Sequence, residues 1–227
     1  CIIIAGTTGE SSTLTMEEHS KVIEEAIHFA RGRVPVVAGT GSNCTATAVQ
    51  LSKEAEEAGA DGLLIVTPYY NKATQAGLVK HYSMIADAVK APIIMYNVPG
   101  RTGCNLMHET VAALVKAKSN IVGLKEATGN VAQAAKTMYL LDGKLDMYSG
   151  EDGIVTPLMA LGALGVISVW ANVAPKKVHD MCMKFLDGDV NGAMQLHLEA
   201  QPLVEAVFSE VNPIPVKEAL NLMGMNA

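Results

Sequence analysis

Short segments rich in Ile, Val and Leu recur along the chain, each bounded by Gly, Pro or polar residues. They are too short for helices, and most are apolar on both faces, which is typical of parallel strands covered by helices. The pattern predicts seven strands, at residues 2–5, 34–38, 63–67, 93–96, 121–125, 145–149 and 166–169.

Between these segments, apolar residues fall three and four positions apart, the spacing of one helix face. Thr15 and Glu18 form a capping box that starts the first helix, and Gly59 is a typical residue just past the end of another. We predict helices near residues 15–30, 48–58, 78–89, 108–117, 130–141, 152–162, 175–187, 190–208 and 214–224.

Strand–helix alternation without a break in composition indicates a single α/β domain. A closed (β/α)8 barrel needs eight strands and typically about 250 residues. We therefore predict a (β/α)8 TIM barrel over residues 1–172 that lacks its first βα unit. A truncated C-terminal helical region, residues 173–227, is expected to pack on it. A doubly wound sheet is disfavoured, because Gly39-Thr40-Gly41 is followed by Cys44 where its glycine fingerprint needs a third Gly.

The two ends of the chain look like internal positions of a longer protein. Cys1 opens a strand pattern without an initiator Met, and Ala227 closes the chain directly after a helical pattern. We expect residues to be missing at both ends, so the sequence does not decide whether a targeting segment exists.

Composition narrows the functional classes. Hydrophobic residues make up 49% of the 227 residues and charged residues 18%, which excludes intrinsic disorder. The net charge of −6, without a Lys/Arg-rich run, argues against nucleic-acid and anionic-membrane partners. No apolar stretch approaches the roughly 18 residues of a membrane span. The four Cys are widely spaced, as in reduced intracellular proteins, and the six His lack metal-ligand spacing, so no metal site is expected.

Polar residues gather directly after the predicted strands. In (β/α)8 barrels the carboxyl ends of the strands carry the active site. The segments at these positions are Gly6-Thr7-Thr8-Gly9-Glu10, Pro68-Tyr69-Tyr70, residues 96–103, residues 125–129 and Ser149-Gly150-Glu151-Asp152. Hydroxyls, one Lys and one Arg are therefore expected to converge at one edge.

Lys125 is the strongest candidate for a catalytic residue among them. It follows the apolar run Ile121-Val122-Gly123-Leu124, so its stem is expected to be buried, and burial lowers the pKa of a Lys. A neutral amine is what Schiff-base formation with a carbonyl requires. The alternative is a structural ion pair with Glu126, although adjacent strand residues point to opposite faces.

The neighbouring hydroxyl and guanidinium groups each allow two interpretations. Tyr70 and Tyr96 can relay protons in imine chemistry, or they are amphipathic residues at the core edge. Thr7 and Thr8 lie between glycines and can bind a small carboxylate, or they form a simple turn. Arg101 suits bidentate capture of a carboxylate, or it is a solvated loop residue.

Four motifs together resemble the pyruvate-dependent class I aldolase superfamily, and within it the dihydrodipicolinate synthase (4-hydroxy-tetrahydrodipicolinate synthase) family. They are Gly6-Thr7-Thr8-Gly9-Glu10, Thr67-Pro68-Tyr69-Tyr70, Tyr96-Asn97-Val98-Pro99 with Arg101-Thr102-Gly103, and Gly123-Leu124-Lys125-Glu126-Ala127. The resemblance extends over essentially the whole chain, as far as Asn212-Pro213-Ile214-Pro215-Val216-Lys217. The first and third motifs differ in N-acetylneuraminate lyases, so Arg101 favours the synthase.

The resemblance implies a lyase of lysine and diaminopimelate biosynthesis that joins pyruvate to L-aspartate 4-semialdehyde. It implies a cytoplasmic homotetramer built from tight dimers, without a metal or organic cofactor. Lys125 would form the imine, and Tyr96 would donate and accept protons. Thr7 would link Tyr96 to Tyr70, which a neighbouring subunit contributes.

The resemblance also implies the substrate-binding residues. Thr8 would hold the pyruvate carboxylate beside the backbone of Gly150 and Ile167. Arg101 would bind the carboxylate of the semialdehyde. Two alternatives remain: an aldolase of sugar acids, which Arg101 disfavours, and a catalytically silent barrel, which would have no reason to assemble the Lys125 set.

Feedback-sensitive members of this family bind lysine at an effector site. The matching residues here are Ser11, His19, Asn43 and Tyr69, whereas Ser12, Met16 and Thr47 stand at the remaining positions. Thr47 takes the place of a Glu, whose carboxylate is the natural partner of a lysine ammonium. We therefore predict weak or absent inhibition by lysine.

Overall fold

The computed structural model describes residues 1–227 and divides into two compact units, residues 1–146 and 147–227. Each unit is described separately below. The predicted boundary between barrel and C-terminal helices, at residues 172–173, falls inside the second unit and stays a prediction.

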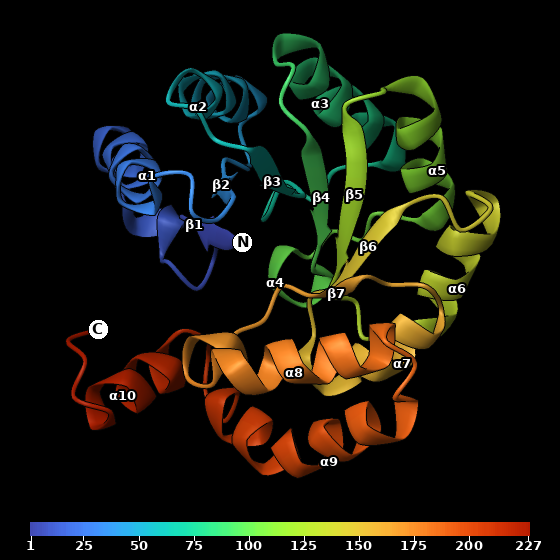
Figure 1. Cartoon of the computed structure of the whole chain (residues 1–227). Helices are drawn as coiled ribbons and strands as arrows, with labels where there is room; N and C mark the ends of the chain where they lie inside the picture. The colour runs from blue at the N-terminus through green and yellow to red at the C-terminus, as the bar shows by residue number, and fades with distance from the viewer. The chain divides into compact units, whose positions relative to one another are not determined.

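Parallel strands alternate with helices throughout the first unit (Figure 1). The strands are β1 (Ile2–Ile4), β2 (Val36–Gly39), β3 (Gly62–Val66), β4 (Ile93–Asn97) and β5 (Ile121–Glu126). The helices are η1 (Ser11–Thr13), α1 (Met16–Ala30), α2 (Thr45–Glu57), α3 (Gln75–Ala88), α4 (Pro99–Thr102), α5 (His108–Ala117) and α6 (Val131–Leu140). Each strand pairs in parallel with the next along the chain.

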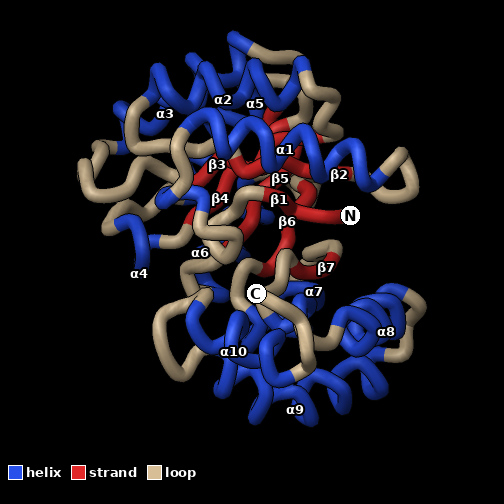
Figure 2. The backbone as a smooth tube through the Cα atoms, turned by 90° about the vertical axis from the view of Figure 1, so that its left-hand side faces the viewer, coloured by secondary structure: helices blue, strands red, loops and turns tan.

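The helices of the first unit lie outside its strands (Figure 2). Helices α1, α2, α3, α5 and α6 contact one another in that order. Strand residues such as Leu63, Ile65, Met95 and Leu124 are fully buried. Burial on both faces explains why the strands are apolar throughout rather than alternating.

Local sequence signals place several helix ends. The Thr15 hydroxyl accepts the Glu18 N–H at 3.2 Å, and the Glu18 carboxylate accepts the Thr15 N–H at 2.9 Å. The predicted capping box is therefore confirmed. Gly59 follows the end of α2 with φ +93°, a conformation that favours glycine, as predicted.

The second unit contains two paired strands and the C-terminal helices. Its elements are β6 (Asp146–Ser149, which starts on the last residue of the first unit), η2 (Asp152–Ile154), α7 (Val155–Ala160), β7 (Gly165–Val166), η3 (Trp170–Asn172), α8 (Pro175–Leu186), α9 (Val190–Val207) and α10 (Ile214–Leu222). Strands β6 and β7 are parallel. Trp170, Met181 and Val204 are buried in one apolar cluster where α8 packs on α9.

Strand β7 is shorter than the predicted strand at residues 166–169. The N–H groups of Val169 and Trp170 donate to the Asp152 carboxylate at 3.0 and 2.9 Å, so they are not available to a strand ladder. The strand ends at Val166, and the segment after it is held by Asp152 instead of a neighbouring strand.

Three further predictions change in detail. The predicted helix at 152–162 is a 3-10 turn followed by the short helix α7. The strand expected from residue 34 starts at Val36, because Pro35 has no N–H for a ladder. Helix α4 was not predicted from the hydrophobic pattern, since four residues are too few to show a helical period. The α/β class and the number of strands are confirmed, and the strands within each unit are parallel.

Candidate active site

Lys125 and Tyr96 lie side by side at the carboxyl ends of neighbouring strands. The register of β4 and β5 places Tyr96 opposite Lys125, and Lys125 Nζ lies 4.2 Å from the centre of the Tyr96 ring. Tyr96 is buried and Lys125 is half-buried. A nucleophilic amine beside a phenol is suited to covalent chemistry that needs proton transfer at each step.

Glu126 follows Lys125, and strand alternation turns its side chain to the opposite face. Its carboxyl group is 1% exposed, and Oε1 accepts the Thr128 N–H at 2.8 Å. Burial raises the pKa of Glu126, although the hydrogen bonds from Thr128 act in the opposite direction. The hydrogen bond to Thr128 holds the turn after β5 in place. The position of Glu126 does not support the alternative of a Lys125–Glu126 ion pair.

The turn that carries Thr7 and Thr8 follows β1 directly. Ala5 has φ +52°, so the chain leaves the strand abruptly, and the Glu10 N–H donates to the Thr7 carbonyl at 3.0 Å. A Cβ on Gly39 of the neighbouring strand would lie 2.3 Å from the Ala5 carbonyl oxygen. Only glycine therefore allows the backbone approach that holds this turn against β2.

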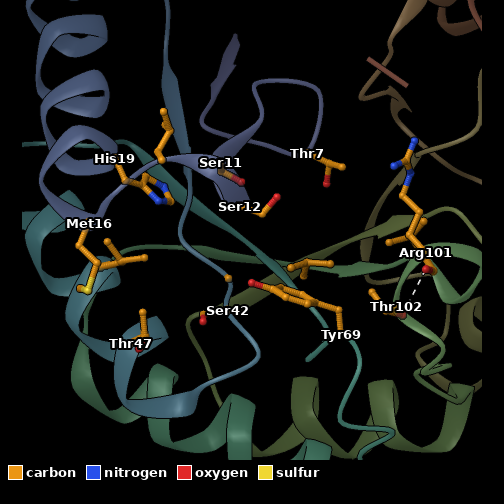
Figure 3. Close-up of a pocket in the computed structure, with 15 residues that line it drawn as sticks. Thr7, Ser11, Ser12, Met16, His19, Ser42, Thr47, Tyr69, Arg101 and Thr102 are labelled. Carbon is orange, nitrogen blue, oxygen red and sulfur yellow. Dashed lines mark hydrogen bonds between the residues drawn. The ribbon is translucent and has the colours of Figure 1, made fainter. Parts of the chain in front are cut away.

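A cavity of about 320 Å³ lies within the first unit. Its lining consists of Thr7, Ser11, Ser12, Leu14, Met16, His19, Gly41, Ser42, Thr47, Leu51, Val66, Tyr69, Val98, Arg101 and Thr102. Figure 3 shows Thr7 and Arg101 on one side, with Met16, His19 and Thr47 opposite. None of the lining residues is Asp or Glu.

The cavity brings together only part of the predicted site. Thr7 and Arg101 line it, whereas Lys125 and Tyr96 do not. It also gathers Ser11, Ser12, Met16, His19, Thr47 and Tyr69, six of the seven residues that the resemblance places at an effector site. His19 is fixed there, since its Nε2 lies 2.7 Å from the Gly39 carbonyl.

Tyr70 lies apart from Lys125 and Tyr96 on the surface of the unit. Its side chain is 88% exposed, its φ is +72°, and its N–H donates to the Thr102 carbonyl at 3.2 Å. It borders a shallow hollow together with Arg101 and Lys72. Its predicted role in a proton relay stays a prediction.

Ile167 belongs to the second unit, where it is held at the end of β7. Its N–H donates to the Ser149 carbonyl at 2.8 Å. Asp152 binds the two following backbone N–H groups, at Val169 and Trp170, as described above. His197 supports Asp152 in turn, because its Nε2 lies 3.1 Å from the Asp152 carbonyl.

The predicted site residues did not include several buried polar side chains around them. Asp152 is 1% exposed and organises the segment after Ile167. Asn97, directly after Tyr96, is fully buried and bonds to Asn105 and to the Leu106 backbone. The available signal was the same in both cases: an Asp or Asn near the end of an apolar strand.

The described residues contain neither a metal site nor a membrane span. No group of three or more His, Cys, Asp or Glu side chains is arranged to hold a metal ion. No helix has both the length and the apolar character needed to cross a membrane.

Comparison with known proteins decides the family. The sequence profile of the Dihydrodipicolinate synthetase family matches residues 1–227. The chain belongs to this family. A 4-hydroxy-tetrahydrodipicolinate synthase of Lachnoclostridium phytofermentans is 59% identical over 223 residues, which cover 98% of this chain and 76% of the relative.

Solved structures of the Dihydrodipicolinate synthetase family share the fold. The crystal structure of dihydrodipicolinate synthase from Aquifex aeolicus matches with a TM-score of 0.97 and 46% identity, covering 99% of this chain and 76% of that one. A monomeric dihydrodipicolinate synthase variant matches with a TM-score of 0.96 and 42% identity, covering 99% and 77%. The resemblance drawn from the sequence motifs is therefore confirmed.

Proposed function

We propose that the chain is a lyase that condenses pyruvate with L-aspartate 4-semialdehyde to give 4-hydroxy-tetrahydrodipicolinate, in lysine and diaminopimelate biosynthesis. Its relatives at up to 59% identity carry the name of this synthase. The observation within the molecule that carries the proposal is the position of Lys125 Nζ over the Tyr96 ring, 4.2 Å from its centre.

Covalent catalysis starts at Lys125. Its neutral amine attacks the ketone carbon of pyruvate, and loss of water gives the imine. Removal of a methyl proton converts the imine into an enamine, whose carbon attacks the aldehyde of the semialdehyde. The amino group of the semialdehyde then attacks the imine carbon and the Lys125 amine leaves, which closes the ring of the product and restores the free Lys125. The iminium accepts the electron pair that the methyl carbon releases, so the chemistry requires no metal or organic cofactor.

Tyr96 is the proton donor and acceptor for these steps. Its phenol lies beside the amine, within reach of the water that leaves and of the oxygen that forms on the attacked aldehyde. Thr7 and Tyr70 are proposed to connect Tyr96 to solvent, with Tyr70 supplied by a second copy of the chain. The exposure of Tyr70 at the surface supports this part.

Substrate carboxylates are proposed to bind at two places. Thr8, with the backbone of Gly150 and Ile167, holds the pyruvate carboxylate. Arg101 holds the carboxylate of the semialdehyde, since a guanidinium can bind both of its oxygens at once. The exposed Arg101 side chain at the edge of the cavity supports this assignment.

The barrel architecture, the cellular location and the oligomeric state are proposed from membership of the same family. We propose that the seven parallel strands belong to a (β/α)8 barrel whose first βα unit lies outside this chain, with the C-terminal helices packed on it. The 76% coverage of the relative supports this arrangement. We further propose a cytoplasmic homotetramer; one of the structural relatives is a monomeric variant.

Steady-state kinetics with alternative acceptors test the substrate assignment. Pyruvate is held constant while L-aspartate 4-semialdehyde and an aldose acceptor such as N-acetylmannosamine are compared. The proposal predicts turnover with the semialdehyde alone, and loss of that preference in Arg101→Ala. Equal or better turnover with the aldose would overturn it in favour of a sugar-acid aldolase.

A further inference from the structure

Three side-chain amides form a buried cluster beside the loop that carries Arg101. They are Asn97 at the end of β4, Asn105 in the loop before α5, and Gln133 in the first turn of α6. Asn97 is fully buried and Gln133 is 7% exposed. Neither the pairing of the strands nor the lining of the cavity requires buried amide side chains at this position. Their presence therefore points to a separate role.

The amides of this cluster bind one another and the same backbone residue. Asn97 Nδ2 donates to Asn105 Oδ1 at 2.9 Å and to the Leu106 carbonyl at 3.1 Å. Gln133 Nε2 donates to the same two acceptors, each at 3.1 Å. Asn97 Oδ1 accepts the Leu106 N–H, and Gln133 Oε1 accepts from Asn105 Nδ2, both at 2.9 Å. A fully satisfied buried network of this kind fixes one geometry.

The cluster ties the loop to the strands that carry the chemistry. Asn97 follows Tyr96, and its carbonyl accepts the Ala127 N–H at 2.9 Å, two residues beyond Lys125. From the other side, Gln75 Nε2 donates to the Asn105 carbonyl at 2.8 Å. The loop is thereby anchored to β4, α3 and α6 at once, and β4 is joined in turn to the segment just after β5.

Arg101 lies between two fixed points. Asn97 holds the start of its segment, and Asn105 with Leu106 holds the end. Between them, Thr102 (labelled in Figure 3) stabilises the short helix α4, since its hydroxyl lies 3.2 Å from the Val98 carbonyl and 3.0 Å from the Cys104 carbonyl. The Arg101 side chain is exposed, and the anchored backbone on either side of it fixes the position from which it extends.

We propose that the amide cluster of Asn97, Asn105 and Gln133 positions Arg101 for the carboxylate of the acceptor aldehyde, and so determines acceptor binding without touching either substrate. Amides suit this task, because they donate and accept in fixed directions and carry no charge that would compete with Arg101. The inference rests on the proposed function, in which pyruvate reacts first at Lys125.

A double-mutant cycle tests the proposal in the full-length protein. Gln133→Ala is expected to lower kcat/KM for L-aspartate 4-semialdehyde about tenfold, because small displacements of a binding group are costly. The KM for pyruvate and the yield of borohydride-reduced pyruvate adduct are expected to stay within about twofold, since imine formation does not use Arg101. In an Arg101→Ala background, Gln133→Ala should cause no further loss.

Controls separate positioning from a general loss of structure. Gln50→Ala removes an exposed helical Gln that bonds only to Glu54 in the same helix, and it should change neither substrate constant. If Gln133→Ala does not fold, Asn105→Ala, at a half-buried position, provides the same cycle.

Two results would overturn the inference. One is an equal loss of pyruvate adduct and semialdehyde turnover, and the other is a tenfold loss that persists on top of Arg101→Ala. If the unmodified protein gives no pyruvate adduct, the proposed function is wrong, and the inference that rests on it is wrong as well.

Discussion

The strand ends that carry Lys125 and Tyr96 and the cavity lined by Thr7 are built in different ways. Lys125 and Tyr96 are opposite each other in a parallel ladder, so their relative position is fixed by the backbone pairing of β4 and β5. The cavity is lined largely from loops, η1 and the first turns of α1 and α2, by side chains such as Ser11, Met16 and Thr47.

The difference shows in which part of the molecule residues can be substituted without disturbing the sheet. A shift of register at Lys125 would move the side chains of an entire buried strand to the wrong face. An exchange of Met16 or Thr47 affects an exposed or half-exposed position and leaves the sheet intact. The position of the proposed reactive pair is therefore fixed by the core, whereas the residues that line the cavity can change at little cost in stability.

Removal of the Lys125 amine should have the largest effect. Lys125→Ala is expected to lower kcat by about 10⁴-fold or more, because no other group replaces the nucleophile. The melting temperature should change little, which thermal denaturation can verify alongside the kinetic assay. Activity within tenfold of the unmodified protein would show that the strand-end pair is not the reactive centre.

Loss of the Tyr96 hydroxyl should have the next largest effect. Tyr96→Phe keeps the buried ring under Lys125 but removes the proton donor, so kcat should fall about 10²- to 10³-fold. The borohydride adduct with pyruvate should still form, more slowly. Tyr82→Phe is the matched control, since that buried hydroxyl donates to the Ile65 carbonyl at 2.9 Å; it should affect stability more than turnover.

Inhibition by lysine should depend on the charge of the side chains that line the cavity. The unmodified protein is expected to show weak or absent inhibition by lysine, because no carboxylate lines the cavity. Thr47→Glu should lower the half-inhibitory lysine concentration about tenfold, and the uncharged Thr47→Gln should not. Half-inhibition of the unmodified protein by sub-millimolar lysine would contradict the prediction.

The smallest effect is expected at Thr15, which caps α1 but is neither one of the strand-end pair nor one of the residues that line the cavity. Thr15→Ala removes the capping box of α1 and should lower the melting temperature by about 3 °C. Turnover should remain within twofold of the unmodified protein. A large change in kcat would show that α1 is coupled more tightly to the reactive strand ends than its contacts indicate.

Much of the first unit could be predicted from the sequence. Apolar runs of strand length gave the parallel strands, and the residues just after them gave Lys125 and Tyr96 as neighbours, since parallel strands present their carboxyl ends on one edge. Thr15 and Glu18 marked a helix start through contacts three residues apart. These features depend on local spacing or on one rule of sheet geometry.

The features that were missed depend on contacts between distant residues. Asp152 holds the segment after β7 by binding backbone groups 17 and 18 residues away. Gln133 joins the amide cluster across 28 and 27 residues. No periodicity or motif encodes such pairings. The predicted roles of Thr8, Tyr70 and Ile167 likewise involve groups from other parts of the protein, so they remain predictions.

Pyruvate trapping tests the central claim most directly. The protein is incubated with pyruvate, reduced with borohydride and digested, and the modified peptide is located by mass spectrometry. The account predicts one adduct, with the mass of reduced pyruvate, on the peptide that contains Lys125, and none in Lys125→Ala. An adduct on another lysine, or none at all, would contradict it.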